Sequence, residues 1–266
     1  MNGTAGETIC VLGLGEAGSL LAKDLIARGA RVVGWDPWPH GDIAAIPFAA
    51  SFAEAVRGAR VVMSVNWARV AEAVARNAAP LVGTNTIYAD FNTSGAALKR
   101  SLAEIIAPTG ARFVDIAIMA PVPGLGIRVP ALAAGPGAQA FVDRFTRFGM
   151  PVQVVDGPPG SAAARKMVRS VYWKGMAAAV NESLEAARAA GIEDWIRADI
   201  AATFEQANTA LVDRLEKGSR QHAVRRGHEM REVVATLSEL GVPSRVSLAA
   251  AESLERMAEQ NAAKAT

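Results

Sequence analysis

Residues 8–36 read TICVLGLGEAGSLLAKDLIARGARVVGWD, and this stretch decides the fold of the chain. Its pattern predicts a buried strand over 8–12, a helix over 19–28 and a second strand over 31–35. Gly13, Gly15 and Gly18 stand between the first strand and the helix with the spacing G-x-G-x-x-G. Asp36 follows the second strand, so the stretch has the strand–turn–helix–strand context that this motif requires.

Each glycine of this motif has a mechanical task. Gly13 makes the tight turn, Gly15 lets the backbone approach a pyrophosphate, and Gly18 lets the helix pack closely on the strand. The start of the helix offers free N–H groups and the positive end of its dipole to phosphates. An acid in the position of Asp36 can bind two ribose hydroxyls. The stretch therefore predicts a dinucleotide site, with a ligand-free glycine turn as the alternative.

Composition limits the class of protein. The chain has 266 residues, of which 51% are apolar, enough for two domains with a sizeable core. A net charge of +2 gives no reason to expect nucleic acid as a partner. The one cysteine, Cys10, falls in the first strand and is expected to be a small buried hydrophobe, so no intrachain disulfide can form. With neither a signal peptide nor a membrane span in the pattern, we expect a cytoplasmic protein.

Two domains are expected, residues 1–157 and 158–266. Strands alternate with helices up to residue 156, which predicts a Rossmann-type, doubly wound parallel sheet. The pattern includes a short strand over 48–50, a capping box at Ser51 and Glu54, and helix capping by residues 92–94. After the Gly-Pro-Pro-Gly break at 157–160, the pattern is helical only. It predicts a long interdomain helix over 161–190 and further helices over 195–217, 221–240 and 244–262.

One face of this long helix carries polar side chains near its start. Lys166, Ser170 and Lys174 are spaced i, i+4 and i+8, and Asn181 follows farther along. A lysine amine at this place can donate or accept a proton if burial lowers its pKa toward neutrality. The ordinary alternative is a solvated lysine.

The order of these parts resembles the β-hydroxyacid dehydrogenase family, which includes 3-hydroxyisobutyrate and 6-phosphogluconate dehydrogenases. The resemblance spans about residues 8–260 and is nearest to an uncharacterised, phosphogluconate-dehydrogenase-like branch. Two segments carry it besides the glycine loop, VDIAIMAPVPGLG at 114–126 and KMVRSVYWKG at 166–175.

The resemblance implies roles for particular residues. Lys166 matches the catalytic lysine of the family, and Ser170 replaces the family's asparagine four residues later. Thr93, in the segment that resembles Asp-x-Ser-Thr, would touch the nicotinamide ribose. The residues expected to bind the cofactor are Gly13, Leu14, Gly15, Glu16, Ala17, Gly18, Asp36, Val65, Asn66 and Thr93.

The chain departs from the family where substrate is expected. Asp115 is in place, but Met119, Ala120 and Pro121 occupy the positions of the usual Ser-Gly-Gly, so the hydroxyl that binds a substrate carboxylate is missing. His228 and Glu229 stand where the family often has Lys-Asp. The residues expected around the substrate are Met119, Ala120, Pro121, Ser170, Lys174 and His228.

These observations predict an NAD(P)-dependent oxidoreductase that transfers a hydride between the cofactor and a small, anionic hydroxy acid. Asp36 favours NAD because a carboxylate repels the 2′-phosphate of NADP, although NADP remains possible. Two alternatives stay open, an imine reductase and a non-catalytic nucleotide-binding module. No metal is expected, since His40, His222 and His228 lack ligand spacing. The resemblance also implies a homodimer. The small net charge and the lack of a membrane span in the pattern predict neither nucleic acid nor membrane as a partner.

Overall fold

The computed structural model describes residues 6–40 and 43–265. The chain forms two compact units, Met1–Arg169 and Ser170–Thr266. The division falls inside helix α6 (Ser161–Ala189), whose first residues belong to the first unit. The sequence places the domain boundary earlier, at 157/158, and that boundary stays a prediction.

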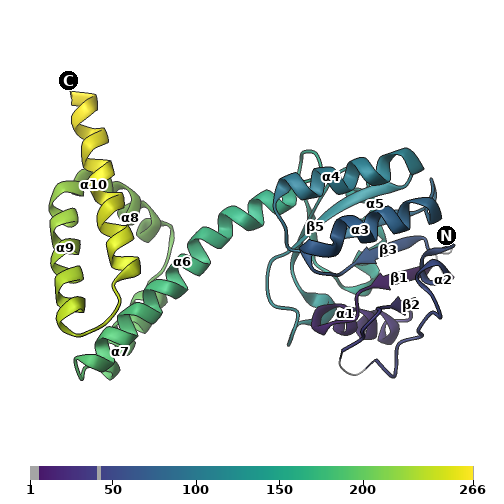
Figure 1. Ribbon diagram of the computed structural model, residues 1–266, viewed down its shortest axis with the longest axis horizontal. Coiled ribbons are helices and arrows are strands. Elements are labelled where there is room, and N and C mark those ends of the chain that lie inside the picture. Colours follow the sequence, from purple (N-terminus) through teal and green to yellow (C-terminus); the bar gives the residue numbers. More distant parts are fainter. Residues whose placement is uncertain (1–5, 41–42, 266) are drawn as a thin grey trace. The chain divides into compact units, whose positions relative to one another are not determined.

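The first unit is built on a seven-stranded sheet with the strand order β2-β1-β3-β4-β5-β6-β7 (Figure 1). All neighbouring strands are parallel except β5 and β6. The strands are β1 Thr8–Leu12, β2 Arg31–Trp35, β3 Val61–Ser64, β4 Ile87–Asp90, β5 Arg112–Ile118, β6 Ala131–Ala134 and β7 Val152–Val154.

The antiparallel pair corrects the prediction of a fully parallel sheet. The segment between β5 and β6 contains only the 3-10 turn Gly126–Arg128, whereas a parallel pair is usually joined by a crossover helix. The remainder of the predicted fold class, a Rossmann-type sheet followed by an all-helical region that begins with a long helix, is confirmed.

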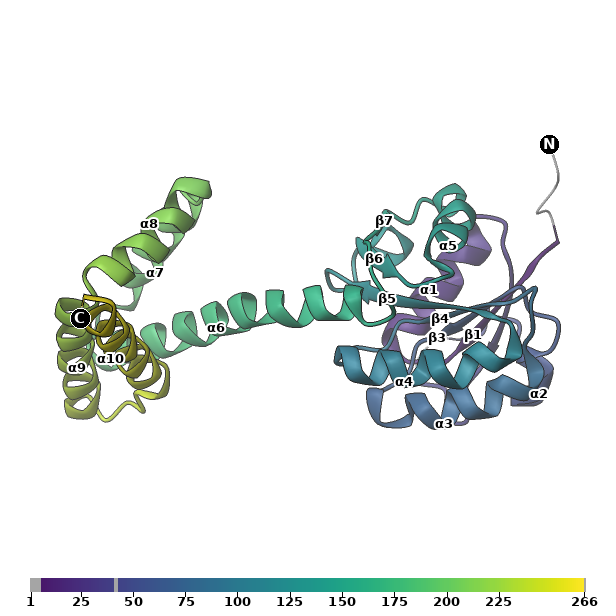
Figure 2. The same cartoon turned by 90° about the horizontal axis from the view of Figure 1, so that it is seen from above.

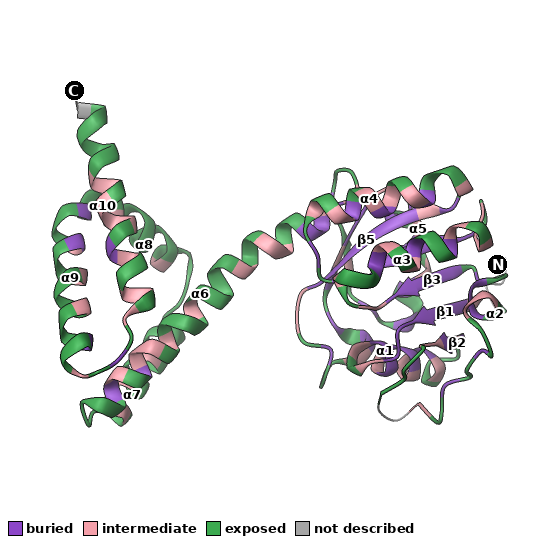
Figure 3. Cartoon of the chain, viewed as in Figure 1, coloured by how far each residue is buried: buried purple, intermediate pink, exposed green. Residues whose placement is uncertain are grey.

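Helices cover both faces of this sheet (Figure 2). One face packs against α1 (Glu16–Ala27) and α5 (Ala138–Phe145), and the other against α2 (Phe52–Val56), α3 (Ala68–Ala78) and α4 (Ala96–Ile106). The inner strands β1, β3, β4, β5 and β6 are almost entirely buried, whereas the edge strands β2 and β7 are partly exposed (Figure 3). Cys10 lies in this core as predicted, and burial raises the pKa of its thiol. The sheet therefore provides a rigid base for the loops at its carboxyl edge.

Two local predictions had different outcomes. The predicted strand over 48–50 is reduced to an isolated bridge between Gly34 and Phe48. The capping box is confirmed, because Glu54 N–H donates to the Ser51 hydroxyl at 3.1 Å. The Glu54 carboxylate in turn accepts from Ala50 N–H at 2.8 Å.

The second unit is entirely helical in its described residues. It contains the later part of α6, followed by α7 (Glu193–Glu205), α8 (Thr209–Gln221), α9 (Ala223–Glu239) and α10 (Arg245–Ala265). The single helix predicted over 195–217 is wrong, because two helices occupy this region. Asn208 separates the two helices because it is the N-cap of α8, and its side chain accepts from Leu211 N–H at 3.1 Å.

One carboxylate holds two distant parts of this unit together. Glu182 on α6 accepts from the N–H groups of Val246 and Ser247 at 2.7 and 2.8 Å, at the start of α10. The Ser247 hydroxyl donates to the same carboxylate at 2.7 Å. Glu182 thus caps α10 from outside the helix.

Among the helices in the described residues, none has the length and apolar character needed to cross a membrane.

Candidate cofactor site and the lysine of helix α6

The turn between β1 and α1 is held in a shape that two of its glycines require. Gly13 has φ +97°, and a Cβ added there would lie 2.2 Å from the carbonyl oxygen of Val65. A Cβ on Gly18 would lie 1.9 Å from the carbonyl oxygen of Gly13. A side chain at either position would therefore push the turn away from the neighbouring strand or helix.

Gly15 differs from both, because its surroundings leave room for a side chain. Its φ is −69°, and apart from its chain neighbours no atom of the described residues lies within 4 Å of the place where its Cβ would stand. This open space adjoins the start of α1, where the first N–H groups of a helix have no intrahelical acceptor.

These features meet at one pocket of about 450 Å³. The residues around it are Gly15, Glu16, Ala17, Gly18, Val65, Asn66, Trp67, Ala68, Phe91, Thr93 and Ile118. Seven of them are among the residues that the sequence assigns to the cofactor. A loop that is open at Gly15 and faced by a helix start has the shape and the dipole that a pyrophosphate needs, so the residues present fit a dinucleotide.

Asp36, at the end of β2, is attached to the glycine loop. Its carboxylate accepts from Leu14 N–H at 2.7 Å and from Trp38 N–H at 2.8 Å. Each carboxylate oxygen has more than one lone pair, so both keep capacity for a hydroxyl donor. The acid is thus held beside the turn in a fixed orientation.

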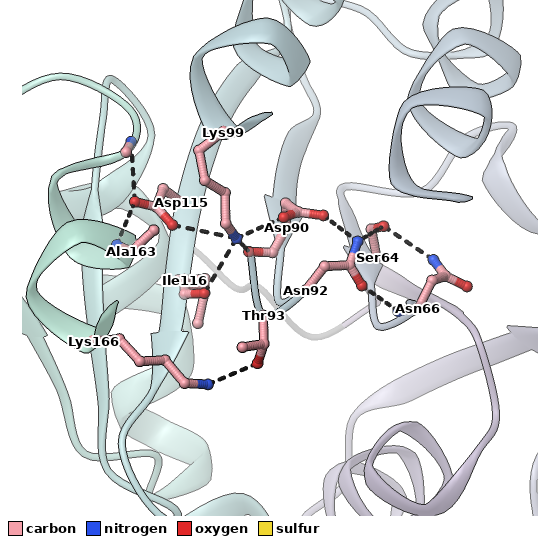
Figure 4. A network of polar contacts seen from close by, with 11 residues as sticks. Ser64, Asn66, Asp90, Asn92, Thr93, Lys99, Asp115, Ile116, Ala163 and Lys166 are labelled. Atoms are coloured by element: carbon pink, nitrogen blue, oxygen red, sulfur yellow. Dashed lines mark hydrogen bonds and ion pairs between the residues drawn. The ribbon is translucent and has the colours of Figure 1, made fainter. Parts of the chain in front are cut away.

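Lys166 lies in the second turn of α6 and reaches the same region. Its ammonium donates to the Thr93 hydroxyl at 2.8 Å (Figure 4). Thr93 lines the pocket described above. The fold therefore brings the predicted catalytic lysine to a predicted cofactor residue, although 73 positions separate them in sequence.

A row of buried polar side chains crosses the sheet below this point. Three neighbouring strands contribute to it: Ser64 is the last residue of β3, Asp90 is the last residue of β4, and Asp115 lies within β5. These residues are register partners, so their side chains share one face of the sheet. Lys99 of α4 points into this row, and its ammonium lies 2.6 Å from the Asp90 carboxylate and 3.3 Å from that of Asp115 (Figure 4). All four residues are buried, Lys99 to 1% exposure.

The second oxygen of each carboxylate has other partners. Asp115 accepts from the N–H groups of Gly160 and Ala163, at 3.0 and 2.9 Å, at the start of α6. Asp90 accepts from the side-chain amide of Asn92 at 2.5 Å. Burial raises the pKa of Asp90; the Lys99 ammonium opposes this effect, and the neighbouring Asp115 carboxylate adds to it.

Asn92 connects this row to the pocket. Its side-chain carbonyl accepts from the N–H of Asn66, which lines the pocket, and its amide also donates to the Ser64 hydroxyl at 3.2 Å. The prediction that residues 92–94 cap a helix is therefore wrong. Helix α4 begins at Ala96 with Gly95 as its N-cap and has no side-chain cap.

The residues expected around the substrate fall in both units. In the first unit, the carbonyl of Met119 accepts from the Arg169 guanidinium at 2.9 Å, and Ala120 and Pro121 follow in the same loop. Ser170 and Lys174 belong to the part of α6 in the second unit, and His228 is exposed on α9.

Comparison with protein-family models gives two matches. Residues 8–125 match the NAD binding domain of 6-phosphogluconate dehydrogenase, and residues 187–257 match a domain of unknown function, DUF1932. The chain belongs to the 6-phosphogluconate-dehydrogenase-like family. The resemblance stated from the sequence is confirmed, and with it an NAD(P)-binding, oxidoreductase-type fold. The comparison with curated proteins finds no match.

Solved structures extend the comparison to nearly the whole length of this family member. A conserved hypothetical protein from Sinorhizobium meliloti 1021 is 31% identical, with 95% of this chain and 88% of that chain covered and a TM-score of 0.62. A conserved protein of unknown function, described as structurally similar to 3-hydroxyacid dehydrogenases, is 29% identical, with coverages of 95% and 97% and a TM-score of 0.62. An imine reductase from Myxococcus stipitatus, in complex with NADP⁺, has the higher TM-score of 0.83 at 19% identity, with coverages of 95% and 94%. That likeness shows the fold alone.

Three residues of the site were missed from the sequence of this family member: Ser64, Lys99 and Arg169. Lys99 left a signal, because it falls on the same stripe of α4 as the buried Leu102 and Ile106. A lysine on an apolar stripe requires a buried partner. The partners themselves, on β4 and β5, could be found only from the strand register.

Proposed function

We propose that this protein is an NAD-dependent oxidoreductase that acts on a small hydroxy acid, with Lys166 as the general acid and base. The observation that carries the proposal is the hydrogen bond from Lys166 to Thr93, at 2.8 Å, beside the pocket of the glycine loop. This hydrogen bond supports the proposal because it holds an amine beside the pocket, where a bound dinucleotide would meet its substrate.

Each part of the candidate site has a separate role in the proposed reaction. When bound, the cofactor supplies hydride transfer. The N–H groups at the start of α1 bind its phosphates, and the open space at Gly15 allows their approach. As the neutral amine, Lys166 takes the proton of the substrate hydroxyl during oxidation, and as the ammonium it returns a proton during reduction, while the Thr93 hydroxyl orients its nitrogen.

The substrate class follows from charge near this lysine. Arg169 lies three residues after Lys166, and its guanidinium reaches the loop at Met119. A guanidinium presents several donors in a planar fork that suits a carboxylate or phosphate. We therefore assign the anionic group of the substrate to Arg169, together with backbone N–H groups near 120–124. Roles for Ser170, Lys174 and His228 stay predictions.

Cofactor choice depends on Asp36. Its carboxylate is fixed by Leu14 and Trp38, so it cannot easily turn away from a ligand on the glycine loop. A fixed negative charge binds ribose hydroxyls and repels a 2′-phosphate. This supports NAD as the preferred cofactor, with NADP used less well.

The test is a screen of hydroxy acids with NAD, followed at the absorbance of the reduced nicotinamide, with Lys166→Ala in parallel. We expect turnover of at least one acid, and a loss of roughly 10²- to 10⁴-fold in the variant with little change in cofactor affinity. Unchanged turnover in Lys166→Ala would remove this lysine from the mechanism.

A panel of cyclic imines with NADH and NADPH belongs to the same screen. Solved imine reductases share the fold at 18–20% identity, which is too low to indicate their activity here. Turnover of imines but of no hydroxy acid would replace the proposal with the imine reductase alternative. NADH binding without any turnover would favour the non-catalytic module.

We also propose that the protein is a homodimer. Large apolar side chains are exposed in the second unit, among them Val171 at 77% and Trp195 at 66%. Soluble monomers rarely expose broad apolar surfaces, so this composition supports self-association. Light scattering of the purified protein is expected to give twice the mass of the chain, and a monomer would contradict the proposal.

A further inference from the structure

Lys99 is unusual because a lysine side chain is almost never fully buried unless its charge is paired. Its ammonium donates to one oxygen of Asp90 at 2.6 Å and lies 3.3 Å from one oxygen of Asp115. It also donates to the carbonyl oxygens of Asp90 at 2.8 Å and Ile116 at 3.5 Å. The side chain comes from α4, whereas its partners come from the end of β4 and the middle of β5.

Each carboxylate that contacts Lys99 is attached by its second oxygen to a different half of the candidate site. Asp115 holds the N–H groups of Gly160 and Ala163, and thereby fixes the first turn of α6. Lys166 follows in the next turn of that helix.

On the other side, Asp90 holds Asn92, which accepts from the N–H of Asn66 in the cofactor pocket. Thr93 is the next residue after Asn92, and its hydroxyl accepts the hydrogen bond from Lys166. A continuous series of polar contacts therefore runs from the start of α6 to the pocket, and the Lys99 ammonium is its central link (Figure 4).

Stability alone does not account for such a cluster. Replacing a buried ion pair by well-packed apolar side chains is often neutral or stabilising, because desolvation of the charges offsets their attraction. What a buried ammonium between two carboxylates does supply is a fixed geometry, with directed bonds to elements that are far apart in sequence.

We propose that Lys99 is a positioning residue that sets where Lys166 stands relative to Thr93 and the cofactor pocket. It touches neither cofactor nor substrate and acts through Asp115 on α6 and through Asp90 on the pocket. This inference rests on the proposed function, in which Lys166 is the acid and base.

The main test is the double variant Lys99→Met/Asp90→Asn. It removes one positive and one negative charge together, and it leaves Asp115 with both of its N–H partners at the start of α6. Arg100→Met is the matched control, because Arg100 is the next residue of α4 and is exposed.

We expect the double variant to bind NADH within about threefold of the wild-type affinity, and to lose roughly 10- to 100-fold in kcat with KM for the hydroxy acid nearly unchanged. Amide exchange over residues 160–166 is expected to become at least about tenfold faster, because Asp115, which holds the first turn of α6, loses its contact with the Lys99 ammonium. Arg100→Met should leave all three quantities unchanged. A folded double variant with unchanged kcat, or with unchanged exchange at 160–166, would overturn the proposal.

A second variant tests the proposal in case the double variant does not fold. Asp115→Asn keeps the pair of Lys99 with Asp90 and weakens only the attachment to α6, so it should reproduce the fall in kcat and the faster exchange. Wild-type kcat and exchange in this variant would also overturn the proposal. If Lys166→Ala retains turnover, the proposed function fails, and the exchange measurement still decides whether Lys99 holds α6. If Lys166→Ala loses turnover and the Lys99 variants do not, only the positioning role fails.

Discussion

Replacing Gly15 by alanine separates cofactor binding from folding. Alanine fits the backbone, because φ is −69° and, among the residues that the structure describes, only the chain neighbours come within 4 Å of the new Cβ. Lower entropy of the unfolded chain favours the variant by about 0.4–1 kcal/mol. Alanine is a poorer N-cap than glycine for α1, which costs roughly the same amount. The two effects offset to within about 0.5 kcal/mol, or a shift in Tm of roughly 1–2 °C.

Binding should respond much more strongly than stability. The added methyl group occupies the space that a pyrophosphate would use to approach the N–H groups of α1. Losing one hydrogen bond to a charged group costs about 1.5–3 kcal/mol. At about 1.4 kcal/mol for each factor of ten, the Kd of NADH should rise roughly 10- to 150-fold.

The assay pairs an NADH fluorescence titration with a thermal melt. Gly18→Ala provides the opposite case, since its Cβ would lie 1.9 Å from a carbonyl oxygen and should lower the free energy of unfolding by about 1–3 kcal/mol. Gly175→Ala is the control for NADH binding, because it lies outside the glycine loop and, apart from its own helix backbone and chain neighbours, no atom of the described residues lies within 4 Å of its Cβ. As a glycine inside α6, it should gain about 1 kcal/mol of stability on this change. Wild-type NADH affinity in Gly15→Ala would refute the assignment of this space to the cofactor.

Three further predictions test other parts of the molecule. Thr93→Val removes the hydroxyl that accepts from Lys166 and should lower kcat about tenfold in steady-state kinetics, more than it changes the Kd of NADH. Asp36→Asn should reduce the ratio of kcat/KM for NAD over NADP by about tenfold, and an unchanged ratio would show that Asp36 does not select the cofactor. Glu182→Gln should lower the free energy of unfolding by about 1 kcal/mol at pH 7 in urea denaturation, because α10 loses a charged cap.

The last of these effects should depend on pH. Burial acts to raise the pKa of Glu182, but hydrogen bonds from the Ser247 hydroxyl and the N–H groups of Val246 and Ser247 outweigh it, so the pKa is lowered. A lowered pKa in the folded state means that the stabilisation is present above the ordinary glutamate pKa of about 4.3 and is lost as pH falls through the folded value. Wild type and Glu182→Gln should therefore converge in acid, and a constant difference down to low pH would contradict this origin.

Some features of the site can be predicted from short stretches of the sequence. The glycine loop and Asp36 lie within one β-α-β unit, and their backbone requirements allow few residue types. The long helix after residue 160 was also predictable to within one residue at its end, because a run of helix formers closes at Gly191. Lys166 could be proposed from its place on this helix and from the family resemblance, but its contact with Thr93 could not.

The remaining features depend on which segments become neighbours. The direction of β6 follows from the short connection after β5, and the break between α7 and α8 from one cap at Asn208. Lys99 shows the difference most clearly. Its place on the apolar stripe of α4 indicates a buried lysine, but only the register that places Asp90 beside Asp115 gives its charge two buried partners. Sequence by itself determined the backbone conformations that the chain requires, because those constraints act over a few residues. The tertiary structure alone decided the charge pairing, because an ion pair depends on distances between segments that the chain does not fix until the sheet has formed.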